Sequence, residues 1–313
     1  MTPEDRLQAA LERQPLEADT LALAYRDAAA ALARARSDPA QAWREERLNA
    51  LVGRAHARLF REPVPAGRRL RDFVTGGWAA RVREQAVWTA AAAGIFVVAV
   101  VAGFGAVALD PDAATELLGP VELERIVAWG DAGRWLPHAE GVAAFGVAAE
   151  FFQKNASIAL DVFASGIAFG LGSVWRLLHN GVAHGALWAT ARHHGALPLL
   201  VRFTVCHAPL EFPAIFLAGG AGMRMGWSLV APGLRTRRRA LIEESREAAG
   251  VMVGVVVMLL FAALIEGLIS PKLSTSWASL PFGCAVLAGL VFVLRPARPP
   301  APPQTGPAES SRR

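Results

Sequence analysis

Cysteine is scarce in this sequence, and the short motifs that mark common active sites are missing. The only two cysteines, Cys206 and Cys284, both lie in apolar stretches, which excludes a disulfide framework and a cysteine-rich zinc motif. The chain also has no His-Glu-x-x-His or His-x-x-Glu-His pattern, and no phosphate-binding loop in its N-terminal region. We therefore expect no catalytic residue, no bound metal and no cofactor.

The sequence also lacks a leader segment and has very little lysine. The first thirty residues contain no basic segment followed by an apolar run, so we expect no cleavable signal peptide and a first apolar span that directs insertion itself. Lys154 and Lys272 are the only lysines, and arginine supplies the remaining positive charge behind a pI of about 10.1. No basic stretch is interleaved with aromatic residues, so we expect no nucleic-acid partner.

Apolar residues are what the chain has in abundance. They make up 53% of the sequence, and the mean hydropathy is +0.32. This balance is too apolar for an ordinary soluble domain. The sequence therefore predicts an all-α, polytopic membrane protein with about six transmembrane helices, whose first partner is the lipid bilayer.

One apolar stretch, residues 205–222, carries polar residues that a simple membrane anchor avoids. His207 and Glu211 lie within it, and an ionisable group at bilayer depth normally faces protein or a water-filled cavity. Pro209 suits a first helical turn, so we expect a helix to begin or restart there and the central span to be discontinuous. Small residues at Ala218, Gly222 and Gly226 allow another helix to pack closely.

Hydropathy and charge divide the chain into three regions. Residues 1–87 are predicted to form a cytoplasmic helical hairpin, broken at Asp38-Pro39, that ends in an interfacial amphipathic helix. Residues 88–295 form the membrane domain. Residues 296–313 form a Pro-, Ala- and Ser-rich tail that we expect to be disordered.

Apolar runs within the membrane domain predict the individual spans. Their ranges are 88–109, 156–178, a shorter or discontinuous span at 182–200, the central stretch from 205, 249–268 and 278–294. Asn180-Gly181 is read as a turn or break signal. Residues 110–140 are acidic and residues 230–248 form the most basic loop, which places the former outside and the latter, with both termini, in the cytoplasm.

Polar residues inside the apolar spans need partners, because an unpaired polar group in lipid is costly. The candidate members of an intramembrane polar cluster are Asn155, Asp161, Asn180, His207, Glu211 and Glu266. We expect His207 and Glu211 to hydrogen-bond to each other or to free backbone groups. Two interpretations of the carboxylates stay open, an ion or proton path and buried pairs that fix helix register. A zinc site with His179 or His184 as further ligands is the least favoured.

Glycines at four-residue spacing are candidate helix-packing positions. These positions are Gly166, Gly170, Gly181, Gly185, Gly219 and Gly222. We favour contacts within one chain over dimerisation, and the oligomeric state stays open.

Several short motifs follow one another along the chain, and their combined order is more specific than any single motif. They are Tyr25-Arg26, Leu48-Asn49-Ala50-Leu51-Val52-x-x-Ala55-His56, Asn155, Gly166-Ile167-x-x-Gly170-x-Gly172, Asn180-Gly181-x-x-x-Gly185, His207-Ala208-Pro209-Leu210-Glu211 and Ile265-Glu266-Gly267 with Ser270-Pro271. Over residues 20–295 the chain resembles the stage II sporulation protein M family of integral membrane proteins. It departs from the family's His-Gly-x-x-Glu segment at Ala208, where the family more often has glycine.

The resemblance implies a membrane component which, in spore formers, works with peptidoglycan-degrading partners during engulfment. We therefore expect a non-enzymatic scaffold or recruiter in the bacterial inner membrane, with envelope partners such as peptidoglycan-acting enzymes. The alternative is a permease or channel-like protein whose polar track runs through Asp161, His207, Glu211 and Glu266. A membrane-embedded, metal-dependent hydrolase is the least favoured.

Overall fold

The computed structural model describes residues 2–12, 18–37, 41–60, 66–133 and 140–295. These residues form helices and connecting turns, with no strand among them. The chain divides into two compact units, Met1–Leu70 and Arg71–Arg313, which are described separately. The predicted break at Asp38-Pro39 and the predicted disordered tail 296–313 lie outside the described residues.

Three helices of the described residues pack together in the first unit, and the sequence patterns predict only the second and third. They are α1 (Pro3–Glu12), α2 (Ala18–Ser37) and α3 (Ala42–Leu59). Leucines and alanines from all three form its core, including Leu7, Leu21 and Leu48, each with an exposed fraction of 1% or less. Burial raises the pKa of Glu4, but hydrogen bonds from its backbone and from Arg44 outweigh this and leave that pKa below its usual value.

The segment that leads into the second unit is helical but broken. It consists of α4 (Ala66–Asp72), a π-helical stretch Phe73–Gly77 and α5 (Trp78–Glu84). The indole Nε1 of Trp78 donates to the carbonyl of Val251 at 3.2 Å, and Arg83 donates to the carbonyl of Leu294 at 3.0 Å. Helix α5 packs on α13 and α15, and the compact second unit begins at Arg71.

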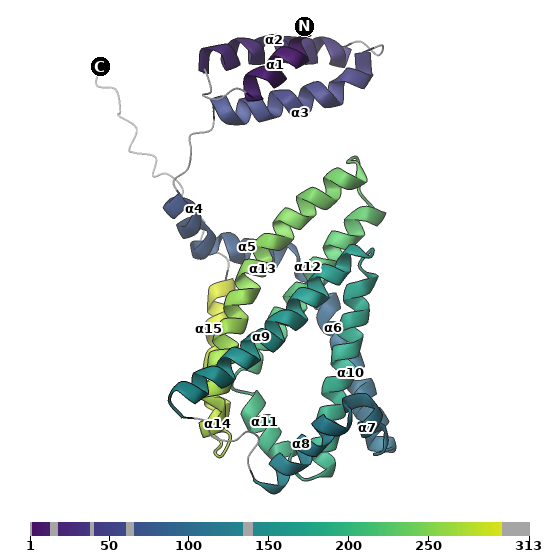
Figure 1. Ribbon diagram of the computed structural model, residues 1–313, viewed down its shortest axis with the longest axis vertical. Coiled ribbons are helices and arrows are strands. Elements are labelled where there is room, and N and C mark those ends of the chain that lie inside the picture. Colours follow the sequence, from purple (N-terminus) through teal and green to yellow (C-terminus); the bar gives the residue numbers. More distant parts are fainter. Residues whose placement is uncertain (1, 13–17, 38–40, 61–65, 134–139, 296–313) are drawn as a thin grey trace, which may run out of the picture. The chain divides into compact units, whose positions relative to one another are not determined.

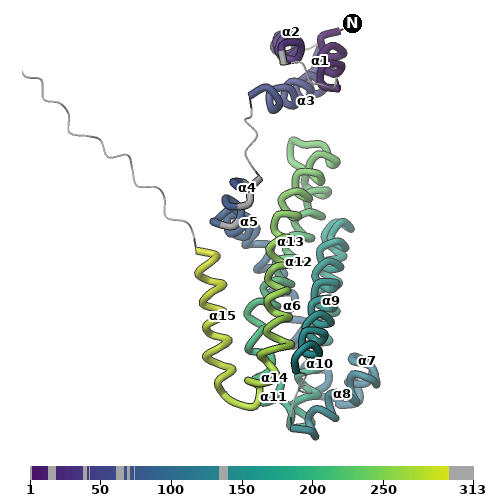
Figure 2. The backbone as a smooth tube through the Cα atoms, turned by 60° about the vertical axis from the view of Figure 1, so that its left-hand side comes forward, coloured from purple at the N-terminus to yellow at the C-terminus, as the bar shows by residue number. Residues whose placement is uncertain are grey.

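The second unit is a bundle of long helices that run up and down in turn (Figures 1 and 2). The long helices are α6 (Ala86–Leu109), α9 (Val142–Ala164), α10 (Leu171–His193), α12 (Ala208–Val230), α13 (Arg237–Leu268) and α15 (Ser279–Leu294). Four short helices gather at the end opposite the α12–α13 turn (Figure 1): α7 (Ala113–Leu118), α8 (Pro120–Asp131), α11 (Leu197–Thr204) and α14 (Ser270–Leu273).

Two helices, α6 and α13, are each long and apolar enough to cross a bilayer. The bent pair α11 and α12 counts as a third if it forms one span. The predicted span at 88–109 corresponds to the helix α6, and the predicted helix start near Pro209 is confirmed by α12, which begins at Ala208. The basic segment 237–248 and the span 249–268 form one helix, α13.

The prediction for residues 156–200 is wrong. A predicted span at 156–178 is interrupted by the 3-10 turn Ser165–Ile167 and by Phe169 and Gly170, both with positive φ (57° and 84°). Asn180-Gly181, predicted as a break, lies inside α10 instead. The physical reason is that Asn180 satisfies its side chain within the helix by donating from Nδ2 to the carbonyl of Arg176, 2.8 Å away.

Glycines allow the long helices of the bundle to approach each other backbone to backbone. A side-chain carbon on Gly166 would collide with the backbone of Gly222, and one on Gly226 would collide with the backbone of Gly166 and Gly170. The other predicted packing glycines also lie at contacts: Gly181 and Gly185 against α6, and Gly219 against Leu177 and Ala92. These contacts join α6, α9, α10 and α12 within one chain.

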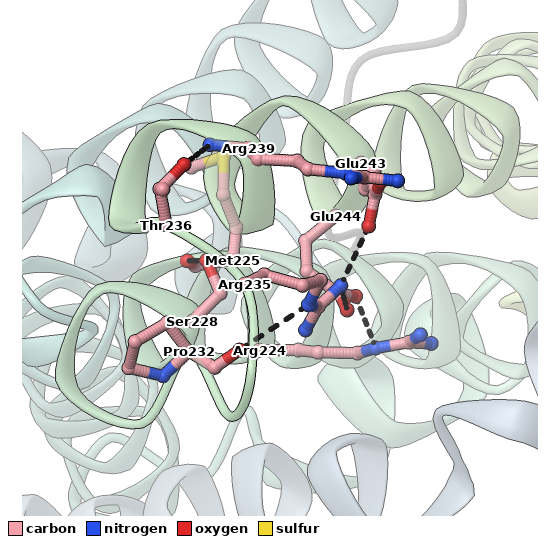
Figure 3. Close-up of polar contacts among 9 residues, drawn as sticks. All are labelled: Arg224, Met225, Ser228, Pro232, Arg235, Thr236, Arg239, Glu243 and Glu244. Carbon is pink, nitrogen blue, oxygen red and sulfur yellow. Dashed lines mark hydrogen bonds and ion pairs between the residues drawn. The ribbon is translucent and has the colours of Figure 1, made fainter. Parts of the chain in front are cut away.

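Arginine–glutamate ion pairs hold the α12–α13 turn (Figure 3). Arg224 on α12 bonds Glu244 on α13 at 2.8 Å, and Arg235 in the turn bonds Glu243 at 3.0 Å. The hydrogen bond to Glu243 raises the pKa of Arg235. Thr236 caps α13, since its hydroxyl accepts from the backbone N–H of Arg239 at 3.3 Å. Arg224 and Arg235 are therefore both paired with glutamates of α13.

Candidate polar site at the α11–α12 bend

A bend of 74° between α11 and α12 creates the site. Three residues separate the two helices, and the last of them, His207, is the N-cap of α12. Pro209 lacks a backbone N–H and fits the first turn, where that group has no partner. Glu211 lies one turn after His207, near the positive end of the helix dipole. One short segment thus places a histidine and a carboxylate side by side.

The third polar residue is Glu266, from the last turn of α13. His207 Nε2 lies 3.6 Å from Glu211 Oε2 and 3.9 Å from Glu266 Oε1. All three side chains are buried, and one potential ligand atom from each lies within 4.8 Å of the others. The predicted hydrogen bond between His207 and Glu211 is not formed, because 3.6 Å exceeds hydrogen-bond distance.

A hydroxyl orients the imidazole ring. His207 Nδ1 lies 3.1 Å from Oγ of Ser270, a fully buried residue at the start of α14. The ring of Phe203 on α11 packs edge-on against it, with centroids 5.3 Å apart. The imidazole is therefore fixed from two sides, and its Nε2 faces the two carboxylates.

A cavity of about 150 Å³ adjoins this trio. Its lining comes from α8, α9, α10, α11, α12 and α13, so most of the bundle contributes to it. The polar lining residues are Glu122, Arg125, Lys154, Asn155, His184, Thr204, His207, Glu211 and Glu266. The remainder of the wall is apolar and largely aromatic, including Trp129, Trp188 and Phe212. The space is large enough for water molecules and offers them polar partners.

One buried oxygen in the cluster has no partner. Among the described residues, Glu266 Oε2 is buried without a hydrogen bond, and Glu266 is only 7% exposed. Leaving a buried polar atom unpaired costs about 1–3 kcal/mol, and more for a charged group. Hydrogen bonds among the described groups therefore do not satisfy every buried polar atom of the cluster.

Four of the six predicted cluster residues meet at this cavity, and two do not. Asn155, His207, Glu211 and Glu266 all line it. Asp161 instead pairs with Arg176 at 2.9 Å and is about half exposed. Asn180 bonds the backbone of its own helix. Neither residue lines the cavity, so the described residues do not form a single polar track through Asp161 and His207.

Two residues of the site were beyond the reach of pattern analysis. Ser270, the partner of His207, has only its position before Pro271 as a signal, and Lys154 at the cavity wall reads as an interruption between apolar runs. Of the two histidines considered as zinc ligands, His184 lines the cavity, but its Nδ1 bonds the carbonyl of Asn180 at 2.9 Å. His179 lies outside the cluster.

Comparisons with known proteins match two parts of the chain to protein families. Residues 5–61, within the first unit, match a family described as a domain of unknown function (DUF8413). No match was found among the curated proteins or the solved structures. Residues 92–271, more than half of the chain, match the family described as Stage II sporulation protein M. That range contains the bend, the buried trio and the packing glycines, and the chain belongs to the stage II sporulation protein M family.

Proposed function

We propose that this protein crosses the bacterial inner membrane six times, through α6, α9, α10, α12 with α11, α13 and α15. The bond from Arg83 to Leu294 brings the start of α6 and the end of α15 to the same end of the bundle. Arginines concentrate near that end, at Arg81, Arg83 and the α12–α13 turn. Positive-inside bias makes this the cytoplasmic end, together with both termini. The acidic segment 110–140 then faces outward.

This topology is tested by labelling single cysteines. In a chain with Cys206→Ser and Cys284→Ser, Leu234→Cys marks the α12–α13 turn and Ser276→Cys marks the α14–α15 connection. Both native residues are exposed. We expect a membrane-impermeant maleimide to label Ser276→Cys in intact spheroplasts and to label Leu234→Cys only after permeabilisation. The reverse pattern contradicts the assignment, and equal labelling of both in intact cells contradicts any fixed orientation.

We further propose that the protein is a non-enzymatic scaffold that positions envelope partners, with peptidoglycan-acting enzymes as the expected class. The observation that carries this proposal is the packed interior beyond the cavity. Buried apolar side chains of α6, α9, α10 and α12 fill it, including Phe96, Leu177 and Met223. The glycine contacts of Gly166 with Gly222 bring backbones together beside them. Such packing favours a rigid support over a continuous polar path.

A permease is the second candidate, because three buried ionisable side chains line one cavity. Replacing Glu211 with glutamine distinguishes a scaffold from a permease. A scaffold with Glu211→Gln keeps its partners in affinity purification from native membranes, at amounts within about twofold of the wild type.

A permease loses proton or ion flux in proteoliposomes while remaining assembled. Asp161→Asn, which removes a carboxylate outside the cavity, is the matched control in both assays. Loss of flux in Glu211→Gln but not in Asp161→Asn overturns the scaffold proposal. The scaffold proposal is also overturned if the wild-type protein captures no wall-acting enzyme.

A further inference from the structure

We propose that His207, Glu211 and Glu266 bind one divalent transition-metal cation at the α11–α12 bend. The site would connect the start of α12 to the end of α13, with Ser270 of α14 behind the histidine. This inference does not depend on the scaffold role. Sequence spacing alone predicts no metal here, because Glu266 comes from a distant part of the chain.

The distances within the trio fit ligands around an ion better than hydrogen-bonded neighbours. Nitrogen and oxygen ligands lie about 2.0–2.2 Å from a zinc-sized ion, so tetrahedral neighbours are roughly 3.4 Å apart. The observed separations from His207 Nε2 are 3.6 Å and 3.9 Å. Both are too long for hydrogen bonds and only slightly longer than the ligand spacing.

The histidine has the outer partner that a metal-bound imidazole usually has. Metal-binding histidines generally donate their second ring N–H to an oxygen, which fixes the tautomer. Ser270 Oγ lies 3.1 Å from Nδ1 of His207 and can accept that hydrogen bond. The lone pair of Nε2 is then directed at the space between the two carboxylates.

The charge of the two carboxylates also favours a bound cation. Glu211 and Glu266 are buried beside each other, and no arginine or lysine of the described residues forms an ion pair with either. Lys154 lines the same cavity but is exposed. Glu266 Oε2 is buried and has no partner among the described groups, which is an independent sign that the site lacks a ligand. A bound divalent ion would offset both carboxylates.

The ligand types narrow the class of metal. One imidazole with two carboxylates suits zinc, manganese or ferrous iron better than calcium or magnesium, which prefer oxygen ligands alone. The adjoining cavity leaves room for water at the remaining coordination positions. A proton shared between the two carboxylates is the competing occupant. The experiment below distinguishes a metal ion from such a proton.

The test is elemental analysis of the full-length, tag-free protein purified in detergent, together with thermal unfolding. We expect about one zinc, manganese or iron atom per chain. After chelation, adding Zn²⁺ or Mn²⁺ should raise the unfolding temperature of the wild type. Glu266→Gln and His207→Gln should lower the affinity for Zn²⁺ at least tenfold, and Ser270→Ala about tenfold. His184 lines the same cavity, and His184→Gln should leave the affinity for Zn²⁺ unchanged. Asp161→Asn should also leave it unchanged.

Several results would overturn the proposal. A wild-type protein with no metal and no Zn²⁺- or Mn²⁺-dependent rise in unfolding temperature would leave only protons at the site. Full metal content in Glu266→Gln, or equal loss in His184→Gln, would place the ion elsewhere. If the cluster variants fail to assemble, metal content and thermal shift of the wild type decide alone. Partner capture by the wild type can fail without affecting this result, so the scaffold role and the metal site are separable.

Discussion

Replacing Gly166 with alanine should destabilise the second unit by about 3 kcal/mol, the upper part of the range for overpacking. The added carbon would collide with backbone atoms of Gly222, and backbone cannot move aside as the end of a flexible side chain can. Relief requires the 3-10 turn after α9 to separate from α12, which also disturbs the contact of Gly226 with Gly170. We expect a lower thermal unfolding temperature in detergent and poor recovery of monodisperse protein.

The matched control is Gly94→Ala on α6, where a new side-chain carbon meets nothing within 4 Å. Alanine favours a helix over glycine by about 0.5–1 kcal/mol, so this variant should be unchanged or slightly more stable. Equal stability of the Gly166 and Gly94 variants would show that the close α9–α12 contact is not what holds the bundle together.

Replacing Trp78 with alanine should cost about 3 kcal/mol and release α5 from the bundle. The Trp78 side chain is 9% exposed, packs over Gly254 of α13 and donates to the carbonyl of Val251. Its removal leaves a cavity and loosens the helix that carries Arg81 and Arg83. We expect a lower unfolding temperature and faster tryptic cleavage at Arg81 and Arg83.

Two further variants separate packing from polarity at Trp78. Trp78→Phe keeps an aromatic ring and loses the indole N–H, so about 1 kcal/mol is expected. Trp175→Ala removes an indole that is 66% exposed on α10 and should change neither stability nor cleavage. Cleavage of α5 at the wild-type rate in Trp78→Ala would mean that α5 is held by its other contacts, such as the Arg81–Glu247 pair.

The fold could be predicted from local sequence wherever one residue determines the backbone conformation. Pro209 is favoured in a first helical turn, so a helix start near this residue is predicted from the sequence itself. The apolar run of α6 is equally self-sufficient. The pairing of His207 with Glu211 in one region also follows, because the two are a single helical turn apart.

Tertiary contact determines what local patterns missed. The break after α9 contains neither proline nor asparagine, and it exists because Gly170 adopts a positive φ where it meets the backbone of Met223 on α12. The same patterns place a false break at Gly181, which is helical and packs against α6. Glu266 is a predicted member of the polar cluster, but Ser270 is not, because it lies 63 residues further along the chain and meets His207 only through folding.

The shortness of α15 has a consequence for the surrounding lipid. Its 16 residues give a helix about 24 Å long, whereas a typical hydrocarbon core is about 30 Å thick. If α15 crosses the bilayer as proposed, the acyl chains beside it must shorten or Arg295 must extend toward the headgroups, each at a modest energetic cost per ångström of mismatch. The protein would then partition preferentially into thinner regions of membrane, where that deformation is smallest.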